Sequence, residues 1–397
     1  MRVLHAYNQH RGGGGANNVT QATIELQRAQ GLQVEVLARN ALHLPQGLRG
    51  LPGRLEAGTG VVWGGSSVRE FRALLERFQP QVVHVHEIYP MVSPWILPEC
   101  TRRGIPVVMS CVDFRMTCPL VTHTRDGRSC TRCLDPGREW HAIRHNCRGS
   151  LPESAASALY NVGVRALGLF ARHVDHYIAP SAFAGQWLVR HAGLPADRLS
   201  VISPPVHMPD TAADAAQGSY IAYAGRFAPE KGLPVFAAAA RATGLPFRMA
   251  RHHASLVTTD VPAGPEVVVT HDAAELQAFY RGARALVLPS LWFETFGLVG
   301  AEAMSHGIPV IGSRLGSVAD LIEEGVDGLL FEAGDAQALA RQVRLLWDDP
   351  SLAARMGQAA RAKALSHWAP QRHAEQVLQV YETLLSRAGR PAGVAPP

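Results

Sequence analysis

Short apolar runs alternate with longer amphipathic stretches along the chain. In the first half the apolar runs fall at 2–7, 33–37, 82–86, 105–110, 177–179 and 199–202. In the second half they fall at 220–224, 267–269, 285–288, 309–311 and 328–331. Apolar runs separated by helix-length segments are typical of parallel strands covered by helices on both faces. The pattern predicts an α/β protein with two Rossmann-like, doubly wound domains that face each other across a cleft.

The domain boundary is predicted by a linker rich in proline and small residues, "SPPVHMPDTAADAAQGS" at 203–219. We therefore expect a first domain over 1–203 and a second domain over 204–369. The amphipathic spacing of 370–387 predicts a helix, and we expect this last helix to complete the first domain. In sheets of this kind, ligands bind beyond the carboxyl ends of the strands, so the loops at those ends are the informative ones.

Composition allows a large core and excludes some partners. The 397 residues are 47% hydrophobic and 18% charged, and the net charge is +5. This mildly basic balance is not that of a nucleic-acid-binding protein, whereas an anionic small molecule or an acidic membrane face fits it. Only two lysines occur, Lys231 and Lys363, against a background of arginine. A lysine retained in such a sequence indicates a site that needs a compact ammonium group.

Membrane and export signals are weak in this sequence. The opening residues, "MRVLHAYNQH", lack the charged-then-apolar order of a signal peptide. No uncharged stretch reaches the roughly 18–20 apolar residues that a membrane span needs. We expect a cytoplasmic protein and leave open a peripheral contact with the inner face of the membrane.

A basic loop follows the first strand of the second half. In "AYAGRFAPEKGLPVF" (222–236), Arg226 and Lys231 flank a short loop that opens a helix. Two cations beside a helix N-terminus form a site for a diphosphate. The alternative is a pair of solvated cations, but one of the two lysines of the chain stands here.

Two glutamates lie in a second loop of the same kind. In "LPSLWFETFGLVGAEAMSHGIPVIGS" (288–313), Glu294 and Glu302 flank a turn and the start of a helix. Free amides around Phe296, Gly297 and Leu298 can meet phosphate or sugar oxygens. Carboxylates are poor neighbours for phosphate but good acceptors for paired hydroxyl groups. The two glutamates therefore suit sugar and ribose hydroxyls on either side of a diphosphate, although each alone could be a cap or a solvated side chain.

A glycine-rich loop, "QHRGGGGANNVTQA" at 9–22, precedes the first predicted helix. Gly14 and Gly15 would let the backbone approach a phosphate or a reacting sugar closely. Such loops are weak signals, and a plain flexible turn explains this one equally well.

Together these stretches resemble the retaining GT-B glycosyltransferases of family four. The resemblance lies in "GRFAPEKG" (225–232), "PSLWFETFGLVGAEAMSHGIPVIGS" (289–313) and "GVDGLLFEAGD" (325–335), and extends more weakly over the first half. It implies a nucleotide-diphosphate sugar donor, most often a UDP- or GDP-sugar, held by the second domain, and an acceptor held by the first. By the same resemblance Arg226 and Lys231 would bind the diphosphate, Glu294 the donor sugar and Glu302 the ribose. Amides around Phe296–Leu298 would support the sugar or phosphate.

The sequence departs from this family at two loops. A histidine that often follows the strand at 105–110 is replaced by Val112 in "PVVMSCVDFRMTC" (106–118). Asp113 is the nearest polar replacement, and His86, at the end of "VVHVHEIY", could also point into the cleft. The predicted catalytic residues are therefore Asp113, His86 and Glu294. The second departure is "RMARHHASL", where a glycine pair is common and where His252 or His253 could substitute.

Cysteines gather in one segment of the first half. Cys118, Cys130, Cys133 and Cys147 lie in an insertion at 111–149 that contains the Cys-x2-Cys pair of "SCTRC". A zinc knuckle with four thiolate ligands is one interpretation, and unligated thiols are the other. Three histidines of the insertion are alternative ligands: His123, His141 and His145. The insertion is also rich in arginine, which would suit an anionic acceptor or simply a solvated basic surface.

The sequence thus predicts a retaining glycosyltransferase that needs no catalytic metal, with structural zinc as an open question. In the family's front-face reaction the departing diphosphate can assist, so the main demand is stabilisation of its charge. The expected acceptor is a glycan, a lipid-linked carrier or a small metabolite of a biosynthetic pathway such as polysaccharide synthesis. Two alternatives remain: an enzyme of another type on the same scaffold, such as a sugar-nucleotide epimerase, and a catalytically degenerate binding or scaffold protein.

Overall fold

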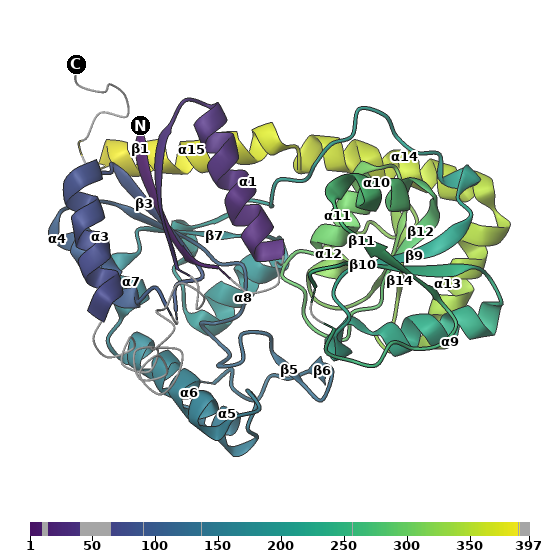
Figure 1. The fold of residues 1–397 in the computed structure, drawn as a ribbon, viewed down its shortest axis with the longest axis horizontal. Helices are drawn as coiled ribbons and strands as arrows, with labels where there is room; N and C mark the ends of the chain where they lie inside the picture. The colour runs from purple at the N-terminus through teal and green to yellow at the C-terminus, as the bar shows by residue number, and fades with distance from the viewer. Residues whose placement is uncertain are drawn as a thin grey trace.

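Two parallel sheets form the centres of the molecule, side by side (Figure 1). This computed structural model describes residues 1–9, 15–39, 65–89, 91–135, 137–255, 257–387 and 389. The first sheet has the strand order β2-β1-β3-β4-β7-β8, and the second has the order β11-β10-β9-β12-β13-β14. In both sheets every neighbouring pair is parallel. The predicted α/β class with two doubly wound sheets is confirmed.

The first sheet contains all the strands predicted for the first half. They are β1 (Arg2–Asn8), β2 (Gln33–Arg39), β3 (Val82–His86), β4 (Val107–Ser110), β7 (His176–Ala179) and β8 (Leu199–Val201). The helices between them are α1 (Gly15–Ala29), α3 (Gly65–Phe78), α4 (Leu97–Arg102), α7 (Leu169–His173) and α8 (Ala182–Ala192). The strands β1, β3 and β4 are buried almost throughout, which explains their continuous apolar runs.

The second sheet has the strand order typical of nucleotide-binding folds. Its strands are β9 (Tyr220–Ala224), β10 (Phe247–His252), β11 (Glu266–Thr270), β12 (Ala283–Leu288), β13 (Val310–Ser313) and β14 (Gly328–Phe331). Its helices are α9 (Leu233–Thr243), α10 (Ala273–Arg281), α11 (Leu298–Ser305), α12 (Ser317–Leu321), α13 (Ala336–Asp348) and α14 (Pro350–His367). The loop after β9 carries Lys231 and the loop after β12 carries Glu294, at the carboxyl ends of neighbouring strands.

The last helix, α15 (Pro370–Arg387), returns from the second sheet to the first (Figure 1). Its apolar face packs against residues of β1, β3, β4 and β7 and against Ile202, which follows β8, in a cluster of Val3, Val82, Val108, Ile178 and Ile202 with Val377, Val380, Tyr381, Leu384 and Leu385. The assignment of 370–387 to the first domain and the boundaries at 203 and 369 stay predictions.

The cysteine-rich insertion forms a small irregular lobe below the first sheet. It contains a short hairpin, β5 (Thr124–Arg125) and β6 (Arg128–Ser129), and a one-turn helix, α5 (Trp140–Arg144). The next helix, α6 (Leu151–Ala166), ends where Gly168 adopts a left-handed conformation, φ 61°, before α7. In Figure 1 the hairpin reaches from this lobe toward the second sheet.

Candidate functional site

The centre of the site is an ion pair between two neighbouring loops. Lys231 ends the short 3-10 helix η6 (Pro229–Lys231), and its Nζ lies 2.7 Å from Oε1 of Glu294. The loops are also joined by their backbones, since Leu291 N donates to Glu230 O at 2.8 Å. Gly232 makes this approach sterically feasible: its φ is 72°, and a Cβ there would lie 1.8 Å from Pro289 O. Glycine at 232 therefore sets the distance between the lysine and the glutamate.

Glu294 is held by more donors than the lysine alone. Its Oε1 also accepts bonds from Ser290 Oγ at 2.7 Å and from Trp292 Nε1 at 2.8 Å. Burial acts to raise the pKa of Glu294, but Lys231 and these hydrogen bonds outweigh it, and the pKa falls below its usual value. The carboxylate is therefore ionised. Among the described residues no donor reaches its Oε2, which can accept a bond from a ligand.

Lys231 is held in place from two sides. Its Nζ lies 4.7 Å from the ring centre of Trp292, in a cation–π contact, while it pairs with Glu294. An ammonium group has three protons to donate, so these contacts leave donor capacity for a phosphate oxygen. The sequence singled out Lys231 and Glu294 but not Ser290 and Trp292. Both lie in the same stretch, 288–313, but the sequence does not show that their side chains point toward Glu294.

Arg226 is more exposed to solvent than Lys231. Its side chain is 45% exposed and pairs with Glu230 at 3.2 Å. The Arg226 carbonyl accepts a hydrogen bond from Tyr223 at 2.7 Å, which fixes the backbone but leaves the guanidinium group at the surface. To bind a diphosphate beside Lys231, Arg226 would have to leave Glu230.

The N-terminus of α11 lies at the same site. Gly297 caps this helix with φ 91° and no side-chain acceptor, so the first amides of the helix lack a side-chain partner. Phe296 is buried and packs edge-on against Trp368, 5.8 Å between ring centres. Its side chain therefore anchors the turn, and the contribution of 296 to a ligand is left to its backbone.

The glycine-rich loop of the first half meets this helix. Gly15 begins α1, and a Cβ on Gly15 would lie 3.5 Å from Cδ2 of Leu298, the first residue of α11. The N-termini of two helices from different halves thus converge, which favours an anion between them. Gly14 lies outside the described residues.

Glu302 occupies the next turn of α11. Its Oε2 accepts a hydrogen bond from Tyr280 at 2.8 Å. Burial raises the pKa of Glu302 to about 7, and the bond from Tyr280 only partly opposes this effect. Glu294 and Glu302 therefore differ in charge at neutral pH: the first is ionised, whereas the second is close to half protonated.

Val112 and Asp113 lie where β4 ends, against the loop of Glu294. Thr295 Oγ1 donates to Val112 O at 2.9 Å, and Ser181 Oγ donates to Thr295 O at 2.7 Å. Asp113 turns away into a two-point ion pair with Arg115, whose NH2 lies 2.7 Å from Oδ2. The structure therefore brings the backbone of 112 to the site while the Asp113 carboxylate is engaged by arginine.

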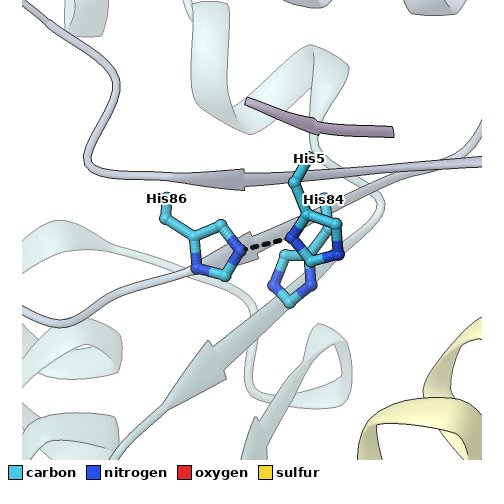
Figure 2. A group of neighbouring side chains, drawn as sticks. All are labelled: His5, His84 and His86. Atoms are coloured by element: carbon cyan, nitrogen blue, oxygen red, sulfur yellow. Dashed lines mark hydrogen bonds between the residues drawn. The ribbon is translucent and has the colours of Figure 1, made fainter. Parts of the chain in front are cut away.

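His86 lies in a buried cluster with His5 and His84 (Figure 2). His86 is 3% exposed, and its Nε2 lies 3.0 Å from His5 Nδ1. Burial lowers the pKa of His5 to about 4 and holds those of His84 and His86 well below the usual value. This burial favours a structural role for His86 over the catalytic role that the sequence suggested.

Hydrogen bonds fix the protons of this cluster. Gln27 Nε2 donates to the Tyr381 hydroxyl at 2.9 Å, so that hydroxyl donates to His84 Nδ1 at 2.6 Å. Gln27 Oε1 accepts from His5 Nε2 at 2.8 Å, which leaves His5 Nδ1 to accept from His86. One hydrogen-bond network thus joins three neutral imidazoles and ties α1 and α15 to the sheet.

His252, the last residue of β10, and His253, which follows it, are at the surface. His252 Nε2 lies 3.1 Å from His271 O, and the ring of His253 stacks near both His252 and His271. Their substitution for a glycine pair stays a prediction.

The four cysteines of the insertion are neighbours. Burial, then the nearby thiols of Cys118, Cys147 and Cys130, raises the pKa of Cys133 to about 12. In the described part of the chain, only the three clustered histidines place three potential metal-binding atoms within 4.8 Å of one another. The thiols therefore form a looser group, and all four are free.

Comparisons with known proteins concern the family and the fold of this chain. A model described as "Glycosyl transferase 4-like domain" matches residues 14–205, and one described as "Glycosyl transferases group 1" matches 257–363. The chain is 40% identical over 102 residues to D-inositol 3-phosphate glycosyltransferase of Arthrobacter sp. (strain FB24). That match covers 25% of this chain and 24% of the relative. Glycogen synthase of Mycobacterium tuberculosis is 38% identical over 110 residues, 28% of this chain and 26% of that one. The matched segment thus spans about a quarter of the length of these curated relatives.

Solved structures resemble the whole fold. Sucrose-phosphate synthase of Thermosynechococcus elongatus superposes with a TM-score of 0.71 at 19% identity, over 97% of this chain and 99% of that one. Anabaena HepE, in complex with UDP-glucose, superposes with a TM-score of 0.62 at 17% identity, over 96% of this chain and 99% of that one. With both family models matched and both sheets in place, the chain belongs to the group 1 glycosyltransferases of the glycosyltransferase 4-like type and has the GT-B fold.

Proposed function

We propose that this protein transfers a hexose from a nucleotide-diphosphate sugar to an acceptor, with retention of the anomeric configuration. The observation that carries this proposal is the preformed Lys231–Glu294 pair beside the N-terminus of α11. It sets a cation for a diphosphate next to an ionised acceptor for sugar hydroxyls, in loops at the ends of adjacent strands. This is the arrangement that a sugar diphosphate needs.

The donor of the proposed reaction is a UDP- or GDP-sugar. HepE, whose fold is similar, has been solved with UDP and with UDP-glucose, which supports a donor of this class. Glu302 would accept hydroxyl groups of the ribose, and Glu294 Oε2 would accept those of the sugar. A carboxylate with a raised pKa becomes a better acceptor when it ionises, so ribose binding and ionisation of Glu302 would favour each other.

Charge on the departing diphosphate would be stabilised without a metal. Lys231 is already in place beside the proposed diphosphate site. Arg226 would leave its ion pair with Glu230 and bind the diphosphate as well. The amides that follow Gly297 would donate to a phosphate oxygen. Electrostatic groups that are fixed before the reaction need no reorganisation during it. Asp113 would act through its ion pair with Arg115, as a group that positions the loop or accepts a sugar hydroxyl.

The acceptor is proposed to bind on the first domain as a glycan, a lipid-linked carrier or a small metabolite. The described residues include no helix long and apolar enough to cross a membrane. On α6, however, large apolar side chains are exposed at Leu151, Leu159, Val162 and Leu167. An apolar helix face beside the arginine-rich insertion would suit peripheral contact with an anionic membrane surface, where lipid-linked acceptors lie. A cytoplasmic location at that surface is part of the proposal.

One observation favours a second function. Val112 is apolar and the Asp113 carboxylate is paired with Arg115, so the first domain offers few free catalytic groups. A degenerate protein that binds a sugar nucleotide without transferring the sugar would fit this arrangement. An epimerase on the same scaffold is the other alternative.

Proton NMR with a panel of UDP-, GDP-, ADP- and TDP-sugars tests these proposals. Saturation transfer reports the bound donor, and slow release of sugar with its configuration kept would support a retaining transferase. Binding without release would favour the scaffold function, and a changed sugar still attached to the nucleotide would favour an epimerase. Binding of none of the donors would contradict the roles of Lys231, Glu294 and Glu302.

A further inference from the structure

The hairpin of the cysteine-rich insertion crosses from the first domain to the donor loops. Ser129 N donates to Leu291 O at 2.9 Å, only three residues before Glu294. At the hairpin tip, a Cβ on Gly127 would lie 3.4 Å from Cβ of Pro229, the first residue of η6. One element of the first domain thus touches both loops that form the Lys231–Glu294 pair.

The turn of the hairpin has the backbone conformation of a tight two-residue turn, which lets the hairpin extend toward the donor loops. Asp126 and Gly127 both have positive φ, 51° and 72°, as in the two-residue turns that match the twist of paired strands. Arg125 pairs with Arg128 and Thr124 with Ser129. In such a hairpin the Ser129 amide points outward, and here it reaches Leu291. So short a hairpin needs support from elsewhere to keep this position.

The four cysteines surround the base of the hairpin. Cys130 directly follows β6, and its amide donates to His123 O at 2.6 Å, which joins both ends of the hairpin. Leu134, next to Cys133, packs on the apolar cluster that contains Cys118. Arg148 NH1 donates to Pro119 O at 3.2 Å, so the segment of Cys147 lies beside that of Cys118. Cysteines that are up to 29 residues apart in the sequence thus lie near one another around the base of the hairpin.

We propose that Cys118, Cys130, Cys133 and Cys147 bind one structural zinc ion that holds the β5–β6 hairpin against the donor loops. The ion would therefore act on donor binding without touching the donor. Four thiolates suit a closed tetrahedral zinc site. None of the four lies in a helix or strand, so drawing the thiols together needs only local adjustment of loops.

Charge in the insertion fits this site. Zinc with four thiolates carries a net charge of about −2. Five arginines stand in the surrounding segments: Arg125, Arg128, Arg132, Arg144 and Arg148. The insertion at 111–149 has more arginines than acidic residues, and this excess of positive charge would offset the charge of the site. The buried histidine cluster is less suited to bind a metal ion, because both ring nitrogens of His5 and of His84 already form hydrogen bonds within the protein.

Metal analysis of the full chain, purified without chelator, tests the zinc ion itself. We expect about one zinc per chain, as in other closed four-ligand sites. Cys130→Ser with Cys133→Ser should abolish zinc binding, whereas Cys100→Ala, a buried cysteine outside the insertion, should keep it. A zinc-free wild type, or cysteines paired in disulfides, would overturn the proposal.

Hydrogen exchange tests the link to the donor loops and does not depend on knowing the donor. Removing zinc should speed exchange in residues 289–295 and 228–232, and adding zinc back should reverse the change. Unchanged exchange there on loss of zinc would contradict the link. If exchange responds but no nucleotide binds, the zinc proposal stands and the proposed transferase function fails.

A matched pair of variants separates the hairpin from the metal. Ser129→Pro removes the amide that bonds Leu291 and leaves all four cysteines, whereas Ser129→Ala keeps that amide. One backbone hydrogen bond is worth about 0.5–1.5 kcal/mol, so Ser129→Pro should weaken UDP binding by about two- to tenfold with zinc still bound. Equal UDP affinity in the two variants would show that the hairpin does not support the site.

Discussion

The Nζ atom of Lys231 lies 2.7 Å from Oε1 of Glu294, and that same oxygen accepts bonds from Ser290 and Trp292. The lysine and glutamate side chains are only 18% and 13% exposed, so water screens the pair weakly. Each partner therefore depends on the other, because removal of one leaves a poorly solvated charge. The pair also makes two contributions that can be measured separately, one to stability and one to ligand binding.

Replacing Lys231 tests both contributions. Lys231→Met keeps most of the side-chain volume but leaves Glu294 without its cation, and we expect it to destabilise the fold by about 2–4 kcal/mol. The double variant Lys231→Met with Glu294→Gln should recover much of that loss in urea unfolding. UDP binding, measured by calorimetry, should fall by about tenfold or more in both, since a charged hydrogen bond to phosphate is lost. Recovered UDP affinity in the double variant would contradict the assigned role of Lys231.

The raised pKa of Glu302 predicts a specific pH dependence of the free energy of unfolding. Its pKa in the folded protein is about 7, against an ordinary value of 4.5 for a glutamate side chain. As pH rises from 4.5 to 7, the unfolded chain releases this proton while the folded chain keeps it, so the glutamate lowers the free energy of unfolding. Glu302→Gln should therefore be more stable than wild type at pH 8, by about 3 kcal/mol at most, with little difference near pH 4.5. A difference that stays constant with pH would contradict the raised pKa.

Much of the fold could be predicted because its signals are local. Buried parallel strands such as β1 and β3 appear as continuous apolar runs, and Gly225 and Gly232 mark the turns that follow β9. The pairing of Lys231 with Glu294 was not visible, because the two residues are 63 positions apart and meet only through the order of strands β9 and β12. Strand order is set by the packing of the whole sheet and not by any one segment.

Side-chain direction explains what the sequence left undecided. His86 ends a strand, like many active-site residues, but alternation along β3 turns its ring into the core beside His84 and His5. Asp113 follows β4, yet Arg115 two residues later captures its carboxylate. The hairpin at 124–129 gave no periodic signal, because two-residue strands are too short to show alternation.

The ion pair between Arg226 and Glu230 can be tested by replacing Glu230. Glu230→Gln removes the charge that holds the guanidinium group in the unliganded protein, so Arg226 would be freer to meet a diphosphate. Because this pair is exposed, its free energy is about 0–1 kcal/mol, and UDP affinity should rise by no more than about fivefold. Arg226→Gln provides the control: in that background Glu230→Gln should have no effect. Weaker binding by Glu230→Gln alone would indicate that Glu230 itself supports the donor.

Gly232 can be compared with a glycine of the same conformation elsewhere. Gly232 and Gly244 have φ of 72° and 66°, but a Cβ at 232 would overlap Pro289 O, whereas one at 244 meets nothing within 4 Å. Gly244→Ala should cost only about 1 kcal/mol of strain. Gly232→Ala should cost more and weaken UDP binding as well, because it pushes Lys231 away from Glu294. Equal stability of the two variants, with equal UDP affinity, would show that the contact with Pro289 is not what fixes the pair.

The Tyr381 hydroxyl connects α15 to the histidine cluster, so its removal should affect both. Tyr381→Phe leaves the Gln27 amide and His84 Nδ1 without a partner in a buried setting, at a cost of about 1–3 kcal/mol for each unsatisfied group. Tyr160→Phe is a suitable control in the same domain, because its buried hydroxyl makes only a long bond of 3.4 Å to Ile88 O. Urea unfolding measures the stability, and nitrogen-15 NMR of the imidazoles reports the tautomers. In the wild type, all three rings should be neutral at pH 6 with the proton on Nε2. If Tyr381→Phe leaves stability and the His84 tautomer unchanged, the inferred direction of the network is wrong, and α15 is held to the first sheet by its apolar face alone.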